Sequence, residues 1–121
     1  MKSGYLALFF VLTSSMTLWA KRVPPPTVNP VIYSGTEYSA HGDGKLAWVV
    51  ATDAATSREL WRAQIFRVHP HFWKGEEDNQ WVYISNLELV QNKILATDER
   101  KRCYLLDLVT KHVSTVRCAN P

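Results

Sequence analysis

The chain has 121 residues, enough for one domain and too few for several. Its 14 Lys and Arg residues exceed its 11 Asp and Glu residues by only three, and this weak basicity argues against nucleic acid as a partner. The one dense basic run, Arg100-Lys101-Arg102, lies between two predicted strands and is expected to be a solvated turn.

The N-terminus has the pattern of an export signal. Lys2 precedes an apolar run from Tyr5 to Leu12. This run is too short for a spanning helix, which needs ~20 apolar residues. We therefore predict a signal peptide over residues 1–20, cut after Ala20, and export to the periplasm or the extracellular space. The residues around the cut fit a cleavage site imperfectly. An uncleaved anchor is thus the alternative, and it would be the only attachment to a membrane.

Residues 21–30 follow as a proline-rich spacer, expected to be extended and free of regular hydrogen bonds. Residues 31–121 form the predicted folded domain. β-branched and aromatic residues are frequent there, helix-period apolar stripes are missing, and turn signals recur at short intervals. The expected strands are 31–33, 45–52, 59–68, 81–90, 94–98, 102–108 and 112–117, with a long loop at 69–79 and a turn at 41–44.

The strand expected at 45–52 carries apolar residues on both faces, which is typical of a central strand. The segment 81–90 is expected as one strand or two, with Ser85-Asn86 as the possible break. From Leu87 onward the pattern predicts a four-stranded antiparallel meander. We therefore predict an all-β domain, a small antiparallel meander of four-stranded, blade-like units that form a twisted sheet or a small sandwich.

Two cysteines, Cys103 and Cys118, flank the turn predicted at Thr110-Lys111. In an exported protein an even number of cysteines suggests a disulfide. The two strands of this hairpin would bring the cysteines side by side, and a bridge closing such a loop would stabilise the fold by about 3 kcal/mol. Two free thiols in a reducing compartment are the alternative.

A strand–turn–strand motif is the most specific pattern in the chain. Its members are Ala51, Asp53, Thr56, Arg58, Glu59 and Trp61. A weaker copy follows at Asp107 and Thr110, each 54 residues after its counterpart. The motif resembles the repeat of the PQQ-binding-like β-propeller family. In that family the turn between the third and fourth strands of a blade carries Ala-x-Asp-x-x-Thr-Gly-Lys-Glu-x-Trp. Ser57 and Lys111 stand where the family prefers glycine.

The resemblance implies structural roles. In the family the motif tryptophan packs between blades, and the aspartate and threonine fix the turn. A propeller needs at least four blades, so this chain cannot close one alone. Several copies or a partner would have to complete the ring. Enzymatic family members hold a quinone with adjacent paired cysteines and calcium-binding carboxylates, which this sequence lacks. The resemblance therefore implies a scaffold without a cofactor.

Few residues suggest chemistry. His69 and His71 alternate along an extended segment and are weak metal-ligand candidates, with His41, Glu76 or Glu77 as further ligands. Otherwise they belong to a polar loop. Asp98 and Glu99 are adjacent in a turn, where we expect them to be solvated rather than to act as an acid–base pair. The sequence contains no recognised nucleophile or phosphate-loop motif, so we expect no enzyme and no cofactor.

Phe72 and Trp73 lie in the long loop. Exposed, they would anchor an interface; folded back, they would cover the open face of the sheet. We therefore expect an exported, non-enzymatic β-module that binds a protein partner or a second copy of itself, or serves as a scaffold. The alternative is a metal- or quinone-bearing subunit completed by oligomerisation.

Overall fold

The computed structural model describes residues 24–69, 71 and 80–119. They form two four-stranded antiparallel sheets, as the all-β prediction requires, and no α-helix occurs among them. Sheet A contains β1 (Val31–Tyr33), β2 (Thr36–Gly42), β3 (Leu46–Asp53) and β4 (Glu59–Arg67). Sheet B contains β5 (Ile84–Val90), β6 (Lys93–Asp98), β7 (Cys103–Asp107) and β8 (Val113–Val116).

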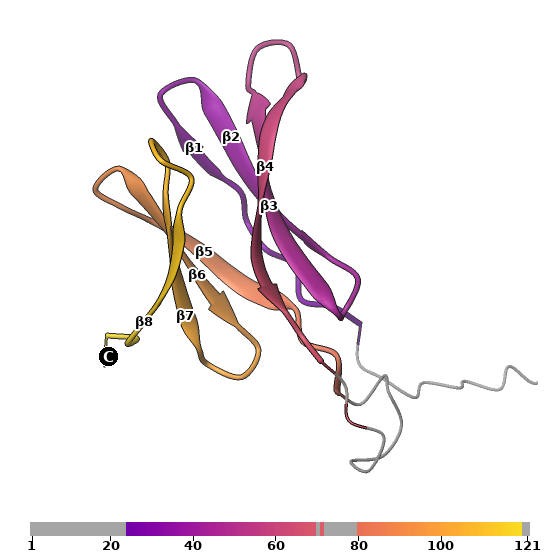
Figure 1. The fold of residues 1–121 in the computed structure, drawn as a ribbon. Helices are drawn as coiled ribbons and strands as arrows, with labels where there is room; N and C mark the ends of the chain where they lie inside the picture. The colour runs from indigo at the N-terminus through magenta and orange to yellow at the C-terminus, as the bar shows by residue number, and fades with distance from the viewer. Residues whose placement is uncertain (1–23, 70, 72–79, 120–121) are drawn as a thin grey trace, which may run out of the picture.

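Each sheet is a simple meander in which strands follow one another in chain order. The two sheets stand side by side, and the turns after β1, β3, β5 and β7 gather at one end of the molecule (Figure 1). The turn between β6 and β7 lies at the opposite end, near the end of β4 (Figure 1). β3 is an inner strand of sheet A, as its two apolar faces predict.

Two local predictions need correction. His41 and Gly42 were expected in a turn but belong to β2, where they pair with Trp48 and Ala47 of β3. Glycine is typical of turns, but pairing with β3 extends β2 through Gly42. The meander begins at Ile84 rather than at Leu87, because its first strand crosses the suspected break with a shift in register between Ile84 and Asn86.

The core lies between the two sheets, which present their inner faces to each other. Sheet A contributes small side chains from β3, all fully buried: Ala47, Val49 and Ala51. Sheet B contributes larger ones, among them Ile94 and Leu106. Both inner faces mix side-chain sizes, since sheet A also buries Tyr38, Ile65 and Phe66 and sheet B also buries Ala96, and this mixture lets the layers interdigitate at high density. Val28 of the proline-rich segment also packs against this core, so the spacer is not wholly a free tether.

Two glycines in turns have a left-handed backbone but very different surroundings. Gly35 has φ +79° and open space where a Cβ would lie. Gly44 has φ +98°, and a Cβ would approach Cγ of Trp81 to 2.6 Å. The Gly44 carbonyl also accepts a hydrogen bond from the Val82 N–H at 2.9 Å, which ties the turn of sheet A to the segment before sheet B.

We expect Gly35→Ala to lower the free energy of unfolding by about 1 kcal/mol, the cost of a left-handed alanine. Gly44→Ala should cost about 3 kcal/mol, because the new methyl group overpacks the base of the Trp81 side chain in addition. Urea denaturation of both variants measures the difference. If both variants lose the same free energy of unfolding, the Trp81 side chain moves aside without cost.

Residues 1–20, where the signal peptide is predicted, lie outside the described part of the chain. Within the described residues, no helix has the length and apolar character needed to cross a membrane.

Candidate functional site

The two copies of the sequence motif form the same turn in the two sheets. Each joins the third strand to the fourth. The Ser57 N–H donates to the Asp53 carbonyl at 2.8 Å, and the Lys111 N–H donates to the Asp107 carbonyl at 2.7 Å. Ser57 and Lys111 have φ of 64° and 63°. Both positions therefore adopt the left-handed conformation that glycine favours, at a cost of about 1 kcal/mol each.

Motif side chains hold these turns. Asp53 Oδ1 accepts the Ala55 N–H at 3.1 Å, and Asp107 Oδ1 accepts the N–H groups of Val109 and Thr110 at 2.8 and 3.1 Å. These backbone donors lower the pKa of Asp107 from its ordinary value. The hydroxyls of the threonines accept from the backbone too, Thr56 from Arg58 at 3.4 Å and Thr110 from His112 at 3.2 Å. The contacts give the motif a structural role.

Trp61 lies where the two sheets meet. It is half-buried, pairs with Ala51 across the sheet, and packs against the core. Its ring centroid is 5.9 Å from that of Tyr38. From the other sheet, Lys111 Nζ stands 5.0 Å from the Trp61 ring centroid, within range of a cation–π interaction. Trp61 thus packs between the two sheets.

The outer face of sheet A, turned away from sheet B, carries an aromatic cluster. We call His41, Trp48 and Arg62 the Trp48 cluster. The rings of His41 and Trp48 stack with centroids 6.0 Å apart and an interplanar angle of 13°. Arg62 Cζ lies 5.9 Å from the Trp48 ring centroid. Because β2, β3 and β4 each supply one member, the rigid sheet fixes the cluster.

Arg62 is held in place from its other side. Its Nε and Nη2 donate to Glu59 Oε2 and Oε1 at 2.9 and 2.8 Å. This two-bond contact lowers the pKa of Glu59 and raises that of Arg62, so both groups stay charged at neutral pH. Beside the cluster, Leu46, Trp48, Arg62 and Gln64 line a shallow groove of about 270 Å³.

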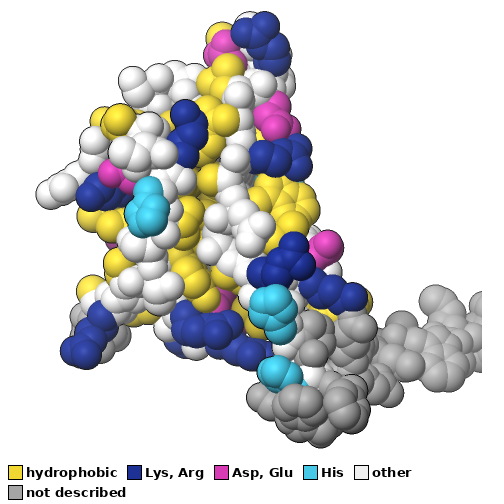
Figure 2. All heavy atoms as spheres, viewed as in Figure 1, with side chains coloured by type: hydrophobic (Ala, Val, Ile, Leu, Met, Phe, Trp, Pro, Cys, Tyr) yellow, Lys and Arg dark blue, Asp and Glu magenta, His cyan; other side chains and the backbone are white. Residues whose placement is uncertain are grey.

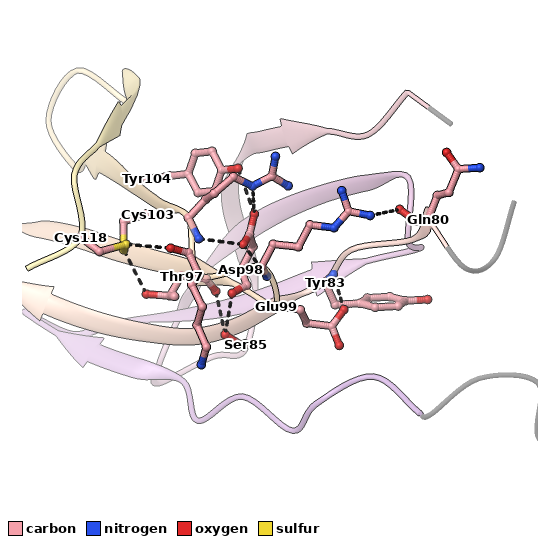
Figure 3. Close-up of polar contacts among 12 residues, drawn as sticks. Gln80, Tyr83, Ser85, Thr97, Asp98, Glu99, Cys103, Tyr104 and Cys118 are labelled. Carbon is pink, nitrogen blue, oxygen red and sulfur yellow. Dashed lines mark hydrogen bonds and ion pairs between the residues drawn. A yellow bond between two sulfur atoms is a disulfide. The ribbon is translucent and has the colours of Figure 1, made fainter. Parts of the chain in front are cut away.

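Asp98 is the most buried acid among the described residues, with no exposed surface, which corrects the expectation that it is solvated. Its Oδ2 accepts from Arg102 Nε at 2.9 Å and from the Tyr104 hydroxyl at 3.1 Å. Its Oδ1 accepts the N–H groups of Arg100 and Arg102 at 2.8 and 3.0 Å. Figure 3 shows Asp98 and Tyr104 turned toward each other. Burial and the Asp98 carboxylate raise the pKa of the Tyr104 phenol.

A basic pocket of about 320 Å³ lies next to this network. Its lining residues are Phe66, Arg67, Val68, His69, His71, Gln80, Arg100, Arg102 and Tyr104. The end of β4, the segment that follows it and the turn between β6 and β7 thus supply its walls. On the face shown in Figure 2, Lys, Arg and His side chains gather at the lower end of the molecule. The basic run at 100–102 is a turn, as expected, but both of its arginine side chains have hydrogen-bond partners within the protein.

The remaining site candidates fare differently. His69 is exposed and His71 is half-buried, and both line the basic pocket. Within the described ranges, no three His, Cys, Asp or Glu side chains are arranged to hold one metal ion. The proposed further ligands Glu76 and Glu77, and the possible interface residues Phe72 and Trp73, lie outside the described residues.

The predicted disulfide is present. Cys103 and Cys118 are bonded, with Cα atoms 5.3 Å apart. Cys103 lies on β7 opposite Val116, the last residue of β8, and Cys118 lies two residues beyond the end of β8. The bridge therefore fastens the end of an edge strand to the sheet.

Comparisons with known proteins do not assign the chain to a family. No protein-family model matches it, and neither curated proteins nor solved structures gave a match. Two four-stranded meanders occur in many all-β folds, so the sheets alone do not identify a propeller repeat.

The sequence alone did not predict the Trp48 cluster or the basic pocket. For the cluster a signal was present, because Trp48 is the one aromatic residue among the small apolar residues of its strand. Nothing local linked Arg67 to Arg100, because they come from different sheets and meet only through packing of the two sheets.

Proposed function

We propose that this chain is an exported, non-enzymatic module that binds another protein through the outer face of sheet A. The Trp48 cluster carries the proposal. Trp and Arg dominate binding energy at protein interfaces, particularly near the centre of a well-packed patch. Here a half-buried Trp48 on an inner strand stands beside a groove, with Arg62 oriented over it by Glu59. The side chains are ordered before binding, which lowers the entropic cost of association.

Export is supported by two observations. The apolar run from Tyr5 to Leu12 has the length of a signal peptide core. The Cys103–Cys118 bridge is of the kind that persists in oxidising compartments such as the periplasm or the extracellular space.

We further propose that the two sheets are copies of one blade-like repeat related to the PQQ-binding-like family. The support is the shared turn. Asp53 and Asp107 occupy the same place between the third and fourth strands, with the same backbone hydrogen bond and the same left-handed residue. A module of two such units would use an outer sheet face to pack against a partner, as one blade packs against the next.

A photo-crosslinking residue at Gln64, beside the groove, tests the proposed interface. In a gentle extract of the source cells we expect it to give one adduct of defined mass. The same residue at Thr115, exposed on β8, should give none. Trp48→Ala should reduce adduct formation at least tenfold, because truncation of a central interface tryptophan costs 2 kcal/mol or more, roughly thirtyfold in affinity.

Leu60→Ala is the control, since Leu60 is an exposed apolar residue of the neighbouring strand β4 and does not line the groove. It should leave the adduct unchanged. Sizing with light scattering on purified protein then distinguishes a different protein from a second copy of this chain as the partner. If the chain associates with itself, the purified protein alone has a mass several-fold larger than one chain. Equal adducts from Gln64 and Thr115, or no effect of Trp48→Ala, would contradict the proposal.

A further inference from the structure

We propose that the basic pocket binds a small molecule with two or more carboxylate or phosphate groups. This inference is independent of the protein interface on sheet A, which lies on a different surface. The pocket spans both sheets, because Phe66 of β4 and Tyr104 of β7 line it together and their rings stack with centroids 5.1 Å apart. Its volume of about 320 Å³ lies at the lower end of the range for small-molecule sites.

The charge of the lining residues selects an anion. Of the residues that the structure describes, three arginines and two histidines line the pocket, and no Asp or Glu does. In the whole sequence, by contrast, basic and acidic side chains are nearly balanced at 14 to 11. A concave surface with one sign of charge concentrates counter-ions of the opposite sign. Arginine in particular presents paired donors that match carboxylate and phosphate geometry.

Two of the three lining arginines are positioned by hydrogen bonds within the protein. Arg102 donates its Nε to the buried Asp98 carboxylate, a contact that orients the guanidinium and does not use its terminal nitrogens. Arg100 donates Nη2 to the Gln80 carbonyl at 3.3 Å. Asp98 in turn accepts four hydrogen bonds, so its own acceptor sites are filled from within the protein. Its charge offsets one arginine, so the described lining residues keep a net positive charge.

The rim of the pocket is fixed as well. His71 N–H donates to Gln80 Oε1 at 2.6 Å, and Gln80 Nε2 donates to the His71 carbonyl at 2.8 Å. Gln80 is almost fully buried, with 8% of its surface exposed. This two-bond clamp holds the two lining segments together, while Arg67 extends from the end of β4 with an exposed side chain. Arg100 and Arg102 are thus organised before an anion arrives, which favours binding.

Calorimetric titration of the purified, disulfide-bonded full-length chain tests the proposal, with citrate and pyrophosphate as probes and acetate as the monovalent control. We expect at least one polyanion to bind with one-to-one stoichiometry and acetate not to bind. Citrate alone binding would assign a polycarboxylate, and pyrophosphate alone a phosphate compound. Added sodium chloride should weaken the binding, because screening reduces the attraction at the open pocket.

Arg67→Gln and Arg100→Gln should each weaken binding roughly tenfold or more, the loss expected for one charge-assisted hydrogen bond. Arg117→Gln removes an exposed arginine outside the pocket and should leave the affinity unchanged. Near-ultraviolet circular dichroism and the urea midpoint confirm that each variant is folded. The proposal is overturned if neither polyanion binds, or if Arg67→Gln and Arg100→Gln both bind like the unmodified chain.

Discussion

Replacing Asp98 with alanine is expected to lower the free energy of unfolding by about 3 kcal/mol. The carboxylate is fully buried and accepts four hydrogen bonds, two from backbone N–H groups and two from the side chains of Arg102 and Tyr104. Hydrogen bonds to a charged group contribute more than neutral ones, and donors left buried without an acceptor lose their solvation as well. Equilibrium urea denaturation of the disulfide-bonded protein measures the loss.

Asp107→Ala is the matched control for Asp98→Ala. Asp107 also accepts two backbone N–H groups in the turn after its strand, but it is partly exposed, so water can replace the lost acceptor. Its loss of stability should be clearly smaller. The loss of stability in Asp98→Asn should fall between those of the two alanine variants. The asparagine oxygen can still accept from the backbone, but its amide nitrogen faces the donors of Arg102 and Tyr104 and cannot accept from them. A loss at Asp98 no larger than that at Asp107 would show that the buried network contributes little.

Local chemistry made most strands and the paired turns predictable. The two apolar faces of β3 indicate a central strand, and the alternating apolar residues of β4 indicate a half-buried one, without knowledge of their partners. The motif turns are equally local, because Asp53 and Asp107 bond to backbone groups only a few residues away. For the same reason the 54-residue repeat correctly indicated two turns of one geometry.

Features that depend on packing were not predictable in this way. β2 contains Glu37, Ser39 and Gly42 and has weak strand propensity, yet it is paired on both sides, by β1 and β3. Asp98 was expected in solvent because Glu99 follows it in a turn. Its burial comes from Arg102 and Tyr104 across the hairpin, and no pattern within residues 98–99 indicates it.

The site candidates show the same division. The cysteine pairing was predictable because a single hairpin places both residues. The basic pocket was not, because Arg67 and Arg100 approach one another only when the two sheets pack together. Patterns among neighbouring residues in the sequence therefore could not predict a cluster of charges that come from two different sheets.

Removing the disulfide is expected to destabilise the protein by about 3 kcal/mol in the chain-entropy model, because the bridge closes a loop between residues 15 apart in sequence. We expect this loss in the double variant with Cys103→Ser and Cys118→Ser, measured by urea denaturation against the oxidised chain. β8 is a four-residue edge strand, and β7 is its one neighbour among the described strands, so its amide hydrogens should lose most protection from exchange.

Thr115→Ala provides the control, because it alters an exposed side chain of β8 while the bridge remains, and its stability should stay near that of the unmodified chain. Intact mass after alkylation, with and without prior reduction, establishes that the bridge forms in the exported protein. Two thiols should become reactive only after reduction. Reactive thiols in both samples would argue against the bridge and against export together, since an oxidising compartment is what makes the pairing stable. Unfolding free energies that agree between the double variant and the oxidised chain would show instead that the pairing of β7 with β8 holds the edge strand by itself.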